Sequence, residues 1–181
     1  MGNCSAPPCR LSLSKPPPFD RLRGLNGYFL GDSFVNGTGD EIGLGWAGRL
    51  CAAVNASGIQ VTYYNLGIRR DTSRDILNRW ACECSRRLPT GCDGRIVLSC
   101  GVNDTTIEHG QIRVPFEESC ANVYQILHDA KAYQVMMVGP PPMDEAQNER
   151  LRTLSSAYAN IAASLDVPYI DIFSPLGYST E

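Results

Sequence analysis

Three short polar segments carry the residue types that acyl transfer needs: Gly31-Asp32-Ser33, Asn65-Leu66-Gly67 and Gly101-Val102-Asn103-Asp104. A serine hydroxyl can attack a carbonyl carbon, while backbone N–H groups and a carboxamide can donate hydrogen bonds to the oxygen that becomes negative. Glycine lets the backbone approach such an oxygen closely. Each segment alone is also typical of an ordinary turn or helix cap, so the hypothesis depends on their lying together.

The hydrophobic pattern predicts elements that would bring the three segments together. Apolar runs predict strands over 28–30, 59–66, 95–100, 134–138 and 167–172, and helical spacing predicts helices over 44–54, 72–88, 116–130 and 151–165. Strands that alternate with helices indicate βαβ units and a parallel sheet with helices on both faces. Ligands of such sheets bind at the carboxyl ends of the strands. Each polar segment follows one of the first three strands.

The three segments also resemble the conserved blocks of the SGNH (GDSL) hydrolases. The first block is similar to Gly31-Asp32-Ser33-Phe34, the second to the segment around Gly67, and the third to Gly101-Val102-Asn103-Asp104. The resemblance covers about residues 27–178 and is strongest to lysophospholipase/esterase-like bacterial members. It implies a flavodoxin-like three-layer α/β/α sandwich whose five-stranded parallel sheet has the order 2-1-3-4-5.

The resemblance further implies a serine ester hydrolase of the esterase or lipase type that acts through an acyl-enzyme. Ser33 would be the nucleophile, and the N–H groups of Ser33 and Gly67 with the Asn103 side chain would form the oxyanion hole. Four further residues would shape the turns without reacting: Gly31, Asp32, Gly101 and Asp104.

One family block has no counterpart here, because the sequence contains no Asp-x-x-His. That block supplies the base that activates serine, and an unactivated serine is a poor nucleophile. We expect the domain to be C-terminally incomplete, with its final helix missing and the chain truncated before the block. His109, which follows the third strand, is an alternative base, although a solvated loop histidine is the plainer interpretation. His128 is a weaker alternative because it lies within a predicted helix.

Composition restricts the remaining possibilities. The chain has 181 residues, a formal charge of −3 and eight cysteines. The acidic balance argues against nucleic-acid binding, and no apolar run is long enough to cross a membrane. Residues 1–26 are rich in proline and resemble no signal peptide, which predicts a mobile tail, a hydrolase domain over 27–181, a cytoplasmic location and reduced cysteines. We expect a small ester or acyl substrate, no metal and no cofactor.

Two other function classes compete with ester hydrolysis. A catalytically impaired relative would keep the pocket and only bind acyl or acetyl groups, which the missing block favours. A nucleotide-binding domain would use Gly43-Leu44-Gly45-Trp46-Ala47-Gly48, which matches G-x-G-x-x-G. That motif begins well after the first strand rather than in its turn, which argues against this class.

Overall fold

A computed structural model describes residues 25–88 and 93–177. Five parallel strands form the central sheet, in the order β2-β1-β3-β6-β7. Their bounds are β1 Leu25–Gly31, β2 Val61–Gly67, β3 Gly94–Ser99, β6 Gln134–Val138 and β7 Tyr169–Ile170. Because β6 and β7 are the fourth and fifth strands of this sheet, the predicted order 2-1-3-4-5 is confirmed.

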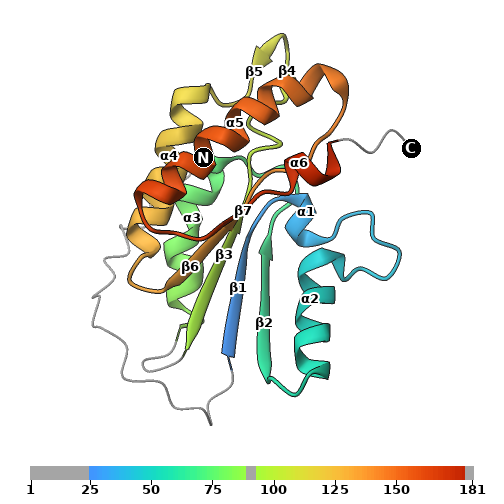
Figure 1. The fold of residues 1–181 in the computed structure, drawn as a ribbon, viewed down its shortest axis with the longest axis vertical. Coiled ribbons are helices and arrows are strands. Elements are labelled where there is room, and N and C mark those ends of the chain that lie inside the picture. Colours follow the sequence, from blue (N-terminus) through green and yellow to red (C-terminus); the bar gives the residue numbers. More distant parts are fainter. Residues whose placement is uncertain (1–24, 89–92, 178–181) are drawn as a thin grey trace, which may run out of the picture.

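Helices cover both faces of the sheet (Figure 1). On one face, α3 (Ser73–Ser85), α4 (Phe116–Ala130) and α5 (Glu145–Ser164) bury the larger apolar cluster, which includes Leu30, Leu98 and Tyr158. On the other face, α2 (Gly45–Ala56) and the one-turn helix α1 (Ser33–Asn36) bury a smaller cluster around Phe29. This is the expected three-layer α/β/α sandwich.

The sequence pattern explains most of these elements. Thr72 caps α3 in a capping box with Asp75, as predicted, since Thr72 Oγ1 accepts from the Asp75 N–H while the Asp75 carboxylate accepts from the Thr72 N–H. Four successive residues of β3, 96–99, are buried, as expected for a strand covered on both faces.

The structure differs from the expected elements in several places, and α5 begins at Glu145 rather than at 151. The first strand is not short: β1 has seven residues and pairs along its whole length with β2, so it begins at Leu25 rather than in the predicted 28–30 run. β7 is shorter than predicted. A hairpin of β4 (Ile107–Glu108) and β5 (Gln111–Ile112) follows β3, and a one-turn helix α6 (Phe173–Leu176) follows β7. Two-residue strands and single-turn helices are too short to show a period, so the pattern missed them.

The tail predicted over 1–26 lies outside the described residues up to position 24, whereas Leu25 and Asn26, which were assigned to it, belong to β1. Five cysteines are described and none of them forms a disulfide: Cys51, Cys82, Cys84, Cys100 and Cys120. Among the residues that the structure describes, no helix is long and apolar enough to cross a membrane.

Candidate active site

The turn after β1 presents Ser33 at the carboxyl edge of the sheet. Gly31 ends the strand where a Cβ would lie 2.3 Å from the Ser99 carbonyl oxygen, so a side chain has no room. Asp32 is the N-cap of α1, and its carboxylate accepts from the Phe34 N–H at 2.9 Å. Ser33 is therefore the first helical residue, and its partly exposed side chain has no hydrogen-bond partner among the described residues.

The end of β2 packs directly against this turn. A Cβ on Gly67 would lie 2.4 Å from the Asn36 nitrogen and 2.7 Å from the Asp32 carbonyl oxygen, so only glycine fits. The Gly67 N–H donates to Asn65 Oδ1 at 3.0 Å. The Asn65 amide nitrogen in turn donates to the carbonyl oxygens of Val35 and Asn36, at 3.1 and 3.2 Å. Asn65 thus fixes the Gly67 amide relative to the helix that begins with Ser33.

The loop after β3 brings the third segment to the same place. Asn103 Nδ2 donates to Asp32 Oδ2 at 3.1 Å and to the Asp71 carbonyl oxygen at 3.0 Å. A carboxamide nitrogen carries two hydrogens, and here both point to acceptors within the protein. The structure therefore joins the segments containing Ser33, Gly67 and Asn103 at one edge of the sheet.

Asp104 lies behind the site and is fully buried. Its carboxylate accepts from the Ser73 N–H and the Ser119 hydroxyl, both at 2.8 Å, and from the Tyr158 hydroxyl at 3.4 Å. These bonds tie the loop after β3 to α3, α4 and α5. Gly101, with a φ of 123°, makes the turn that leads into this loop.

The electrostatics of the site centre on Asp32. Burial raises the pKa of its carboxyl to about 6, and the nearby Asp104 carboxylate acts in the same direction, while hydrogen bonds from Phe34 and Asn103 oppose the shift. Burial also raises the pKa of the Cys100 thiol well above its usual value. Cys100 is therefore a buried thiol beneath the site and not a thiolate nucleophile.

A family model for the GDSL-like lipases and acylhydrolases matches residues 29–181. The chain belongs to this family. The predicted family is thereby confirmed, and it is a family of hydrolases. No curated protein matches the chain.

Several solved structures have the same fold. A lipase/acylhydrolase from Enterococcus faecalis has a TM-score of 0.73 and 22% identity, with 86% of this chain and 80% of that chain covered. AlinE4, an SGNH-hydrolase family esterase, has a TM-score of 0.70 and 19% identity, covering 87% and 80%. An acetylxylan esterase from Geobacillus stearothermophilus, Axe2, has a TM-score of 0.70 and 16% identity, covering 85% and 78%.

Neither histidine occupies the site formed by the three segments. His109 is an exposed residue with a φ of 53° in the turn of the β4–β5 hairpin, where it lines a hollow beside α3. His128 lies near the end of α4, which runs from the carboxyl end of β3 toward the amino end of β6. His128 therefore lies toward the amino ends of the strands, whereas Ser33 lies at their carboxyl ends. It contacts Asp129 and stacks on Tyr124.

The glycine-rich segment that matched the nucleotide-binding pattern has a packing role. Gly45 begins α2, and its backbone lies against Gly37, where a Cβ would be 2.7 Å from the Gly37 Cα. The N–H groups of Leu44 and Gly45 donate to the Asp40 carboxylate at 3.0 and 2.8 Å. The start of α2 is therefore capped by the protein's own side chain, which argues against a phosphate site there.

Sequence reasoning included Asn65 in the second polar segment but not its hydrogen bonds, and it missed Asp71 as a participant in the site. The signal for the role of Asn65 is its position two residues before Gly67, because an Asn side chain often accepts a hydrogen bond from the backbone N–H two residues later. Asp71 takes part through its main-chain carbonyl, which any residue type could supply, so no sequence signal marked it.

Proposed function

We propose that the chain hydrolyses carboxylic esters through Ser33. One observation carries the proposal: the Asn103 amide is hydrogen-bonded to the very residue that caps the Ser33 helix. A hydroxyl and a carboxamide donor are thereby held at one edge of the sheet, with the Gly67 backbone packed against the same turn.

In the proposed reaction, Ser33 Oγ attacks the ester carbonyl carbon. The carbonyl oxygen becomes negative and accepts hydrogen bonds from the N–H groups of Ser33 and Gly67 and from the Asn103 amide. The bond to the alcohol then breaks, and the alcohol leaves with the proton that the Ser33 hydroxyl gave up. Water attacks the acyl-serine in a second step, which releases the carboxylic acid and restores Ser33.

Family members with this fold support an ester as substrate, since the three structures named above are described as a lipase/acylhydrolase, an esterase and an acetylxylan esterase. Two exposed apolar side chains flank the proposed site. Phe34 follows Ser33 and is 38% exposed, and Ile68 follows Gly67 and is 45% exposed. We assign this apolar side to the acyl part of the ester.

A second function, acyl binding without turnover, is favoured by the hydrogen bonds that the donors already make. Both hydrogens of Asn103 Nδ2 and the Gly67 N–H have acceptors within the protein. A substrate oxygen must share or displace these acceptors, which weakens the stabilisation of negative charge.

Hydrolysis of p-nitrophenyl acetate by the chain and by its Ser33→Ala variant tests the proposal. Each protein is assayed with and without added imidazole, which can serve as an external base. We expect the parent chain to exceed Ser33→Ala, with the difference growing as imidazole is added. Because imidazole hydrolyses this ester by itself, Ser33→Ala also provides the background rate.

Equal rates for both proteins at every imidazole concentration would refute hydrolysis through Ser33. Acyl binding would then remain, and it is measured by titrating the folded protein with acetate or octanoate. Under that second function, Ser33→Ala binds these ligands as tightly as the parent chain does.

A further inference from the structure

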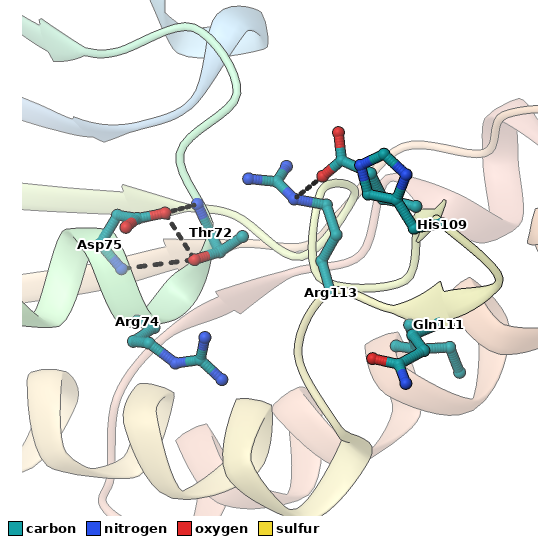
Figure 2. A pocket seen from close by; sticks show the side chains of 8 residues that line it. Thr72, Arg74, Asp75, His109, Gln111 and Arg113 are labelled. Atoms are coloured by element: carbon teal, nitrogen blue, oxygen red, sulfur yellow. Dashed lines mark hydrogen bonds and ion pairs between the residues drawn. The ribbon is translucent and has the colours of Figure 1, made fainter.

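An open hollow of about 330 Å³ lies between α3 and the β4–β5 hairpin (Figure 2). We call it the hairpin hollow. Its α3 side is formed by Thr72, Arg74 and Asp75, and its hairpin side by Glu108, His109, Gln111, Ile112 and Arg113. All but one of these side chains are polar, unlike the apolar Phe34 and Ile68 beside Ser33.

Both walls of the hairpin hollow are hydrogen-bonded to the segment that carries Asn103. The Asn103 amide donates to the carbonyl oxygen of Asp71, which directly precedes Thr72 on the α3 side. On the other wall, the Arg113 N–H donates to the Thr106 carbonyl at 3.0 Å, and the next residue's N–H donates to the Asp104 carbonyl at 3.2 Å. The hollow therefore lies beside the segment that supplies the Asn103 amide to the proposed oxyanion hole.

Three of the four carboxylate oxygens that line the hairpin hollow have partners in the protein itself. Asp75 Oδ2 accepts from the Thr72 N–H and hydroxyl, at 2.9 and 2.6 Å. Glu108 uses one oxygen for Arg70 and the other for Arg113, the latter at 3.3 Å. Asp75 Oδ1 is then the one carboxylate oxygen lining the hollow that has no hydrogen-bond partner among the described residues.

Donors, in contrast, remain available. Arg74 uses Nε and Nη2 to bind Glu118, at 2.5 and 2.8 Å, which leaves Nη1. Arg113 uses only Nε, and its two Nη groups have no hydrogen-bond acceptor in the described part of the chain. Figure 2 shows the two guanidinium groups projecting toward the hollow from different elements, with the Gln111 amide near its rim. Guanidinium N–H groups donate and never accept, and they match the oxygens of a carboxylate or phosphate.

The charges around the hairpin hollow limit the charge of its ligand. Among the lining residues, Arg74 and Arg113 balance Asp75 and Glu108 when His109 is neutral. A ligand with several negative charges would therefore meet carboxylates without a net positive charge to balance them. A single negative charge spread over two oxygens fits the free donors best.

We propose that the hairpin hollow binds a singly charged oxygen group, a carboxylate or a phosphodiester, on the alcohol part of the ester. The assignment to the alcohol part rests on the proposed function, in which the acyl part lies against Phe34 and Ile68. The chain is then specific for esters whose alcohol carries one negative charge.

Two esters with the same acetyl group test this specificity. Phenyl acetate has an uncharged leaving group, whereas 4-acetoxybenzoate carries a carboxylate on the same ring. We expect Arg113→Gln to raise the KM for 4-acetoxybenzoate about tenfold, the loss typical of one charge-assisted hydrogen bond, and to leave phenyl acetate unchanged. Arg74→Gln should act in the same direction, which keeps the test valid if one variant fails to fold.

Arg86→Gln is the matched control, because it removes the same charge from an exposed residue that caps the opposite end of α3. It should alter neither KM. Equal changes for both esters in Arg113→Gln, or no change in either, would overturn the specificity.

Direct binding separates this inference from the proposed function. Benzoate and dimethyl phosphate are titrated into the protein by NMR or calorimetry, and the tighter ligand identifies the preferred oxygen group. Binding that Arg113→Gln weakens, without any Ser33-dependent hydrolysis, would support the anion site and reject the esterase. Ser33-dependent hydrolysis without anion binding would support the esterase and reject the anion site.

Discussion

The buried Asp32 carboxyl predicts a specific dependence of stability on pH. Its pKa lies at about 6 in the folded protein, against 3.8 ordinarily, mainly because of burial. The folded state therefore binds this proton more tightly than the unfolded state does. Raising the pH from 4 to 6 ionises this carboxyl and destabilises the fold. Well above pH 6, the ionised carboxyl lowers the free energy of unfolding by about 3 kcal/mol, because a pKa difference of one corresponds to ~1.4 kcal/mol.

Asp32→Asn removes this ionisation. We expect the free energy of unfolding of Asp32→Asn, relative to the parent chain, to increase by about 2 kcal/mol between pH 4 and 6 and to level off above pH 7. The new amide would face the Asn103 amide, and the contact between two donors would also lower the free energy of unfolding. That penalty does not vary with pH, so it displaces the curve without changing its slope.

Urea unfolding of both proteins at a series of pH values from 4 to 8 measures this difference. Other titrating groups are common to both proteins and cancel when the curves are subtracted. A difference that stays flat from pH 4 to 8 would refute the reasoning. A difference that falls as the pH rises would show that the folded state prefers the ionised carboxylate.

Two further substitutions test how the site is built. Gly67→Ala should destabilise the fold by about 3 kcal/mol in urea unfolding, because the new Cβ would meet the Asn36 nitrogen at 2.4 Å; a loss below 0.5 kcal/mol would mean that the turn yields easily. Thr72→Ala should lower the free energy of unfolding by about 1 kcal/mol, because it removes the capping box with Asp75. Thr153→Ala, on the exposed face of α5, is the control and should lower it less in the same thermal or urea unfolding.

Much of the fold was predictable because its main elements have strong periods and clear ends. The predicted strand over 134–138 has the bounds of β6, and the capping box at Thr72 marks the start of α3. The β4–β5 hairpin was not predictable, since its strands have two residues each and its turn residue, His109, has a φ of 53° without being glycine. The hairpin is also joined to the segment after β2, through the ion pair between Glu108 and Arg70.

The candidate site was predictable in its residues but not in its hydrogen bonds. Three polar segments after three successive strands of a parallel sheet had to meet, because the strands end at one edge. Which acceptors the Asn103 amide would find was not predictable, because one of them is a main-chain carbonyl. The hairpin hollow was missed for a related reason: Arg74 and Arg113 are far apart in the sequence and match no motif.

The hydrogen bonds also decide which variants can report on chemistry. Asn103 links the turn at Asp32 to the segment after β2, and Gly67 fills a space that admits no side chain, so substituting either residue changes the fold as well as the site. Ser33 differs, because its hydroxyl has no partner in the described part of the chain and its Cβ is kept in alanine. Loss of activity in Ser33→Ala with unchanged unfolding therefore reports on the nucleophile alone, whereas loss in an Asn103 variant mixes catalysis with the position of the turn.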